Sequence, residues 1–172
     1  GFKATWARDV EAMTTDLDVD VSLNDQAGID FTSGMSNVPE VLMEPGGSDK
    51  LENMNPQKAE KLLGGLQVRK AEVGVWDESL MDALIEAHPR FEGRSAEDVR
   101  NMMAMQVQRT PYPSKYTQPV ADFIQNSGSL KASLTPSSPV SMSEFFNMGM
   151  QVMAGQSTID RVASAVGFKV SS

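Results

Sequence analysis

The stretch that decides the fold is TTDLDVDVSL, residues 14–23. Its apolar side chains, at Leu17, Val19, Val21 and Leu23, alternate strictly with polar ones. A period of two places the apolar residues on one face, which predicts a half-buried β-strand. A polar turn, NDQAG, follows, and residues 29–35 alternate in the same way. Two alternating runs joined by a short polar turn predict an antiparallel hairpin.

The remaining chain mixes strand and helix patterns. Strands are predicted at Leu66–Trp76, at residues 129–134 and at the C-terminus around Phe168 and Val170. The phase of the first of these changes near Arg69, which predicts a β-bulge. Helices are predicted at Pro56–Leu63 after the cap Asn55, from the cap Asp77 to Pro89, from the cap Ser95 to Arg109, and at Tyr116–Gln125, Met142–Ala154 and Ser157–Val166.

The segment between Asn37 and Asn55 is broken by prolines and glycines. It predicts a helical turn at Pro39–Met43 followed by a surface loop. Together the patterns predict an α+β fold, an antiparallel β-sheet with several short helices packed on one face. We expect Leu17, Val19, Val21, Leu23, Ile29 and Phe31 to face the helices. Residues 1–172 form one predicted domain, with a hairpin part at 1–55 and a helix-strand part at 56–172.

Composition excludes several classes of function. The chain has 172 residues, a net charge of −8, no cysteine and one histidine. An acidic chain lacks the basic stripe that displaces counterions from nucleic acid, so a nucleic-acid partner is not expected. Without cysteine, thiolate metal sites and cysteine nucleophiles are excluded. No apolar run approaches the ~18–20 residues of a membrane span. We expect no metal and no cofactor.

The acidic and histidine side chains that could act in catalysis are explained by structural roles. Asp16, Asp18 and Asp20 share the spacing of a calcium loop, but on a strand they lie about 7 Å apart on a solvated face. His88 stands at a helix end, where an imidazole complements the helix dipole. The acids Asp77, Glu78, Glu86 and Glu144 lie near helix ends, where capping explains them. We therefore predict no catalytic residue, and a carboxylate-based hydrolase is the alternative.

Twelve methionines are the unusual feature of the composition. Methionine adapts its shape, which suits either an irregular core or an apolar pocket. The helix at residues 142–154 is apolar nearly all round, so we expect it to be buried or docked against a partner. If a ligand is bound, the predicted site is a pocket for an acyl chain or an apolar peptide segment. Its predicted lining is Met102, Met103, Phe145, Phe146, Met148 and Met153.

Leu66–Ser172 resembles the C-terminal part of a family of Gram-negative envelope proteins, the YdgA-like group and its alphaproteobacterial relatives. The shared features are the helix starts DESL (77–80) and SAED (95–98), a Phe123-Ile124 helix end, a Gly128–Leu130 strand, a Pro136–Ser141 turn and a closing VGFKV strand. The resemblance implies an extracytoplasmic, periplasmic location, with an anchor outside this chain. It carries over no catalytic residue.

Met142–Ser172 is also similar to the C-terminal helix of type III secretion inner-rod proteins. From the residues and the first resemblance we expect a non-catalytic binding or structural module of the bacterial cell envelope that holds an apolar small molecule or a protein partner. A structural subunit of a phage or secretion apparatus is a further alternative. The sequence leaves the oligomeric state open.

Overall fold

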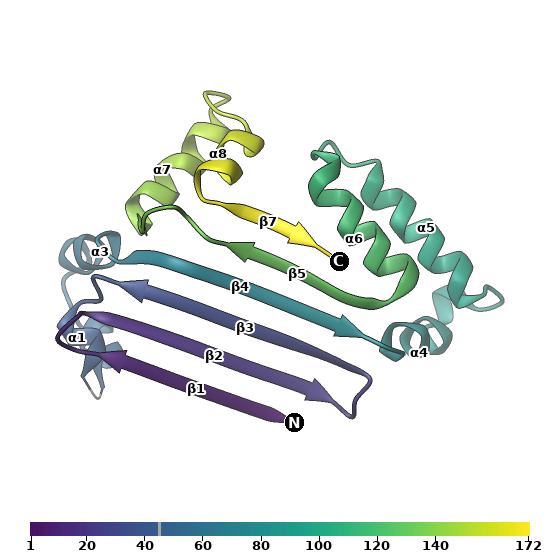
Figure 1. The fold of residues 1–172 in the computed structure, drawn as a ribbon, viewed down its shortest axis with the longest axis horizontal. Coiled ribbons are helices and arrows are strands. Elements are labelled where there is room, and N and C mark those ends of the chain that lie inside the picture. Colours follow the sequence, from purple (N-terminus) through teal and green to yellow (C-terminus); the bar gives the residue numbers. More distant parts are fainter. Residues whose placement is uncertain (45) are drawn as a thin grey trace.

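The computed structural model describes residues 1–44 and 46–172, which form one antiparallel β-sheet with short helices (Figure 1). The strands are β1 (Phe2–Asp9), β2 (Thr14–Leu23), β3 (Ala27–Ser36), β4 (Gln67–Asp77), β5 (Gly128–Leu134), β6 (Val140–Ser141) and β7 (Phe168–Ser171). The helices are α1 (Glu40–Met43), α2 (Gly47–Glu52), α3 (Pro56–Gly64), α4 (Leu80–Ala87), α5 (Ala96–Gln108), α6 (Ser114–Asn126), α7 (Met142–Met153) and α8 (Ile159–Ala165), with a 3-10 turn at Pro89–Phe91. The strand order is β1-β2-β3-β4-β5-β7, and β6 pairs with β4. The α+β prediction is confirmed.

The predicted hairpin is β2 and β3. Val19 lies opposite Phe31 and Val21 opposite Ile29. Asn24 and Asp25 in the connecting turn have positive φ angles of 45° and 56°. Asparagine and aspartate tolerate this backbone region better than other side chains, which explains why the chain reverses here.

The predicted bulge is also present. Gly34 pairs with Lys70 and Met35 pairs with Val68, so Arg69 is the extra residue on β4. The extra residue lets apolar side chains on both sides of the phase change reach one face of the sheet. The Arg69 guanidinium donates two hydrogen bonds of 3.0 Å to the Asp16 carboxylate on β2, which braces the bulge across β3.

Two elements of more than three residues depart from the sequence predictions. The first is β1, an edge strand that sequence reasoning did not identify. The second is α2, a six-residue helix within the predicted surface loop that follows the confirmed helical turn at Glu40–Met43. Pro45, which belongs to that predicted loop, lies outside the described residues.

One face of the sheet carries its apolar side chains, and the helices lie on this face. The pairing aligns Val19, Phe31, Val73, Ala132 and Val170 across five neighbouring strands. Val21, Leu23 and Ile29 share a cavity with α4 side chains and with Phe123 of α6. The prediction that the β2–β3 apolar residues face the helices is therefore confirmed.

The helices stand in two groups at opposite ends of the long strands (Figure 1). The chain between β4 and β5 forms α4, α5 and α6 near the end of β4, whereas α7 and α8 lie near its start. The main core belongs to the first group, where Ala104, Ala121, Phe123 and Ile124 pack together on Val75 and Leu130 of the sheet. The apolar face between the groups is left largely open.

A buried ion pair joins the first helical group to the sheet. Arg100 of α5 and Asp77 at the end of β4 are 4% and 5% exposed. The Arg100 guanidinium donates to Asp77 (3.3 Å), to Asp82 of α4 and to the carbonyl oxygen of Ile124 (2.9 Å). The other Asp77 carboxylate oxygen accepts from the backbone N–H of Met81 at 3.0 Å. Asp77 thus accepts from the first turn of α4 and also neutralises a buried arginine. The prediction that it is the N-cap of this helix is wrong, because β4 continues through Asp77 and the helix begins after Ser79.

We expect Arg100→Met to lower the free energy of unfolding by about 3–5 kcal/mol, because removing one partner leaves the Asp77 charge buried and unpaired. Urea unfolding followed by circular dichroism measures the change. Arg90→Met, at an exposed position, is the matched control and is expected to change stability by less than about 0.5 kcal/mol. Equal effects of the two substitutions would contradict the role given to Arg100.

Candidate functional site

The candidate site is an apolar trough on the helical face of the sheet. Its floor is the row of Val68, Ala71, Val73 and Val75 on β4, with the facing apolar residues of β2, β3 and β5. Since a strand rises about 3.3 Å per residue, the row from Val68 to Val75 is roughly 23 Å long. Val73, at its middle, keeps 40% of its surface exposed although its neighbours on the row are half-buried. The trough is therefore open to a guest along its centre.

A cavity lies at each end of the trough. Near the end of β4, a cavity of about 330 Å³ is lined by residues that include Ile29, Val75, Leu80, Leu84 and Phe123. Near the start of β4, a cavity of about 490 Å³ is lined by sheet residues and one face of α7. Because Ala71, Val73 and Val75 lie in one row on one face, Val73 stands between the two cavities.

Helix α7 forms the wall of the second cavity and leaves large apolar side chains in solvent. Phe146, Met150 and Met153 are 71%, 64% and 86% exposed. The expectation that this helix is buried is wrong for the chain by itself, since none of its residues is buried. The helix contacts the sheet with only part of its surface because it is apolar nearly all round. The alternative, docking against a partner or guest, remains.

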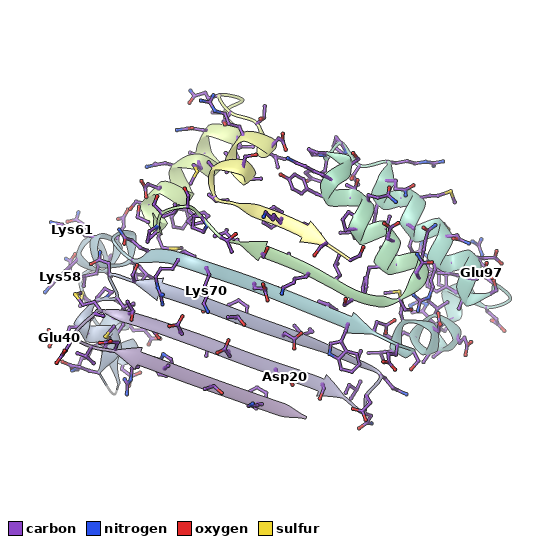
Figure 2. All side chains as sticks on the ribbon, viewed as in Figure 1. Asp20, Glu40, Lys58, Lys61, Lys70 and Glu97 are labelled. Atoms are coloured by element: carbon purple, nitrogen blue, oxygen red, sulfur yellow. The ribbon has the colours of Figure 1, made fainter. Side chains whose placement is uncertain are left out.

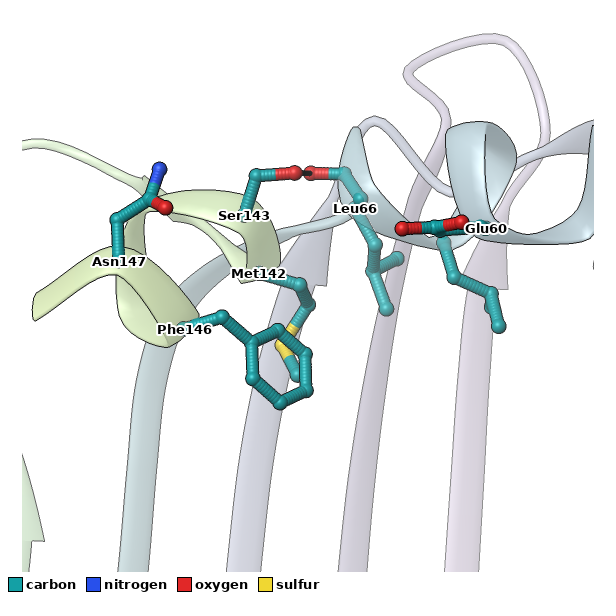
Figure 3. Close-up of a pocket in the computed structure, with 8 residues that line it drawn as sticks. Glu60, Leu66, Met142, Ser143, Phe146 and Asn147 are labelled. Carbon is teal, nitrogen blue, oxygen red and sulfur yellow. Dashed lines mark hydrogen bonds between the residues drawn. The ribbon is translucent and has the colours of Figure 1, made fainter. Parts of the chain in front are cut away.

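A third hollow, of about 800 Å³, separates α7 from α3 (Figure 3). Glu60, Leu63 and Leu66 line one side, and Phe146 and Asn147 line the other. The Ser143 hydroxyl bridges the two helices by donating to the Gly64 carbonyl oxygen at 3.1 Å. Phe146 lines both this cleft and the trough, so the two hollows meet at its ring.

The structure brings together half of the predicted ligand-contacting residues. Phe145, Phe146 and Met153 line the α7 cavity. Met148 is half-buried on the same helix and does not line that cavity. Met102 and Met103 lie on α5 in the other helical group, where Met103 packs against the core and Met102 contacts Arg94. Methionine content alone could not show which helices are neighbours.

Sequence reasoning missed the sheet residues of the site. Ala71, Val73 and Leu134 contribute to the trough floor, and Leu80 and Leu84 contribute to the wall at the other end. The signal was available, since the alternation of β4 and β5 identifies their apolar faces. What the sequence did not reveal is that this face stays uncovered between the helical groups.

The opposite face of the sheet carries the acidic side chains. Asp16 binds Arg69 and lies 3.8 Å from the Lys70 ammonium. Asp20 and Asp30 are direct cross-strand partners. Partial desolvation and the Asp20 carboxylate raise the pKa of Asp30. Among the described residues, no group of three or more acidic or histidine side chains has a geometry that could hold a metal ion.

The other residues considered for catalysis have structural contacts. The His88 ring accepts a hydrogen bond from the backbone N–H of Arg90 through Nδ1 (3.1 Å) and packs near Phe91. Glu144 completes the predicted capping box of α7, with its carboxylate accepting from the backbone N–H and the hydroxyl of Ser141 at 2.8 Å. Asp77 is engaged by Arg100.

Comparison with known proteins finds one matching family model. The model of a family described as "Uncharacterized protein" matches residues 20–171. No curated protein and no solved structure shows a significant match to the chain. In the part of the chain that the structure describes, no helix has both the length and the apolar composition needed to span a membrane.

The capping box predicts a pH dependence of stability. Hydrogen bonds from the Ser141 backbone and hydroxyl lower the pKa of Glu144 in the folded chain. A carboxyl group with a lowered folded pKa stabilises the fold above its unfolded pKa and loses that contribution as pH falls through the folded pKa. Between about pH 6 and pH 3, we expect wild type to lose more thermal stability than Glu144→Gln. Melting curves followed by circular dichroism measure the difference.

Glu86→Gln removes a carboxylate outside the capping box and is the control for lost charge. It is expected to follow wild type across the same pH range. If Glu144→Gln and wild type lost equal stability on acidification, the capping box would not be the source of the effect.

Because the family match covers most of the chain, the protein belongs to this family of uncharacterised proteins.

Proposed function

We propose that the chain is a non-catalytic binding module that holds a long acyl chain in the apolar trough. The observation that carries the proposal is the open row of β4 side chains between two cavities, with exposed aromatic and methionine side chains of α7 beside it. Burying a large apolar side chain is worth about 1.5–3 kcal/mol, so a guest that covers several of them gains substantial free energy. Exposed apolar surface of this extent is typical of interaction sites.

The chemistry of the trough favours a hydrocarbon over an extended peptide. A buried peptide carries N–H and C=O groups that must find hydrogen-bond partners. The residues lining the α7 cavity are Val68, Ala71, Leu134, Met142, Phe145, Phe146, Gly149, Met150 and Met153. None of these side chains offers a strong hydrogen-bond donor or acceptor. An acyl chain requires none, and methionine repacks around its varying shapes.

The dimensions of the trough fit the same guest. One leaflet of the ~30 Å hydrocarbon core of a bilayer corresponds to an acyl chain of about 15 Å. The row from Val68 to Val75 exceeds this length, so one extended chain can lie along it.

A place in the bacterial cell envelope is part of the proposal and is supported by the resemblance to YdgA-like proteins. Fractionation of cells that express the native gene tests it. Recovery of the protein with cytoplasmic markers would oppose an envelope location without bearing on the acyl ligand.

Val73→Asp tests the acyl-chain proposal, because a carboxylate at the centre of the trough would be desolvated by a bound chain. We expect a fluorescent fatty-acid probe to bind wild type and to bind Val73→Asp at least about tenfold more weakly, a difference of about 1.4 kcal/mol. Phe146→Asp, on the α7 wall, is expected to weaken binding in the same direction. Fluorescence titration gives the dissociation constants.

Val10→Asp is the matched control, since Val10 is an exposed valine in the β1–β2 turn, away from the trough. It is expected to leave probe binding unchanged, and circular dichroism checks that each variant is folded. Native mass spectrometry of the purified protein should show a co-purifying apolar species. Absence of probe binding to folded wild type, or equal binding by all variants, would contradict the proposal.

A further inference from the structure

The two edges of the sheet differ in length and in protection. The β7 edge has four residues, and α6 packs beside it, with the Tyr116 ring centroid 5.5 Å from that of Phe168. The β1 edge has eight residues, and all of them are exposed. An unprotected strand edge is a template for pairing with another strand. The β1 edge is therefore the one to examine for a partner.

Hydrogen bonding to β2 fixes which β1 residues face outward. The backbone N–H of Ser22 donates to the Gly1 carbonyl oxygen at 3.0 Å, and the Gly1 nitrogen donates to the Ser22 carbonyl oxygen. In an antiparallel ladder such two-bond pairs alternate with pairs that exchange no bonds. The unbroken β1–β2 register extends this pattern to Asp9. The outward N–H and C=O groups are consequently those of Phe2, Ala4, Trp6 and Arg8.

The same even-numbered residues lie on the apolar face. Phe2 pairs with Val21 and Trp6 pairs with Leu17, so the apolar face continues to the outermost strand. Phe2 and Trp6 are 75% and 59% exposed. Proteins usually protect such edges with proline, a bulge or inward-pointing charge. The β1 sequence has no proline and its register has no bulge, while Arg8 turns its guanidinium over the Trp6 ring and toward the Met43 carbonyl oxygen.

We propose that β1 pairs with β1 of a second copy of the chain, in antiparallel register, with Thr5 opposite Thr5 on the two-fold axis. This register places Phe2 opposite Arg8 and Ala4 opposite Trp6, together with the symmetry-related pairs. Each of the four outward-facing residues of one copy then stands opposite an outward-facing residue of the other. Each of these four pairs exchanges two backbone hydrogen bonds, which gives eight in total. Shifting the register to place Trp6 opposite Trp6 leaves Phe2 unmatched and gives six.

Side chains favour the same arrangement. On the polar face the register pairs Thr5 with Thr5 and Lys3 with Ala7, so no like charges stand opposite each other. On the apolar face it places the large Trp6 opposite the small Ala4, and Phe2 opposite Arg8, so no two large rings stand directly opposite each other. A two-fold axis perpendicular to the sheet keeps both apolar faces on the same side. The dimer would join two sheets into one surface.

A single introduced cysteine tests the register directly, because the chain has no cysteine of its own. Thr5 at a non-hydrogen-bonded pair gives a Cα–Cα distance of about 4.5 Å, within the range that a disulfide spans. Thr5→Cys is expected to form a disulfide-linked dimer under mild oxidation. Thr32→Cys, on the same face of the interior strand β3, is the matched control and is expected to stay monomeric on a non-reducing gel.

Sedimentation equilibrium tests the association without a disulfide. Wild type is expected to reach twice the chain mass of 18.7 kDa. Ala4→Pro removes one outward N–H and leaves the β1–β2 bonds of the odd-numbered residues in place, so it is expected to weaken the dimer at least about tenfold with the circular dichroism spectrum unchanged.

Three outcomes would overturn the proposal: wild type that stays monomeric at all concentrations, cross-linking of Trp6→Cys but not of Thr5→Cys, or a dimer that survives Ala4→Pro and is lost in Phe146→Asp. The last of these would move the interface to α7. None of these measurements uses the fatty-acid probe. Their results therefore test the dimer alone, and the acyl-chain proposal is tested independently.

Discussion

The arrangement of the helices depends on the buried Asp77–Arg100 ion pair. Asp77 is the last residue of β4, and its carboxylate also accepts from the first turn of α4 and from the Ser127 hydroxyl next to β5 (3.4 Å). Arg100 reaches the Ile124 carbonyl oxygen at the end of α6. Two side chains thus connect a strand end with three helices. Because a buried charge is costly unless it is paired and hydrogen-bonded, this set of contacts permits few alternative positions for the helices. Leu80 and Phe123, which form one wall of the trough, are held in place by the same contacts.

The second helical group lacks a buried polar anchor of this kind. Helix α7 is attached by its capping box, by the Ser143–Gly64 hydrogen bond and by the Met142 backbone N–H donating to Leu66 (2.9 Å). These contacts all lie in its first turn, and no residue of the helix is buried. The trough therefore has one wall held by a buried ion pair, and one wall whose hydrogen bonds to the sheet and to α3 lie in its first turn. Such asymmetry suits a site that adapts to the shape of its guest, since the adaptable wall is also the one rich in methionine.

Local sequence patterns predict most of the strands, turns and helix caps. The features they do not predict depend on contacts between residues far apart in the sequence. The alternation of residues 14–35, the phase change at Arg69 and the caps Asn55, Ser95 and Ser141 each express a short-range rule, and each is confirmed. Strand β1 also alternates at Phe2, Ala4 and Trp6, but eight residues with charges near both ends gave a weak signal without their partner strand. Arg100 and Asp77 are separated by 23 positions, and no local rule pairs them. Sequence reasoning predicts one pocket for the methionines of α5 and α7, yet the two helices are inserted between different strands and lie at opposite ends of the sheet.

The two faces of the sheet carry different kinds of side chain, polar and charged on one and apolar on the other, and this difference bears on function. On the polar face, side chains pack over glycines of the neighbouring strand: a Cβ atom at Gly28 would lie 2.4 Å from the Trp76 indole nitrogen, and one at Gly74 would lie 2.9 Å from an Asp30 oxygen. This face also carries Lys70 and the acidic residues of β2 and β3, and Asp20 and Lys70 mark it in Figure 2. On the apolar face, apolar side chains project from the strands, and over β1–β3 several of them, including Phe2, Val21 and Ile29, stay exposed. A sheet with one polar, charged face and one apolar face is organised to make apolar contacts through the second. Helices cover that second face only at its ends, so its centre is the surface on which a guest or partner gains the most free energy.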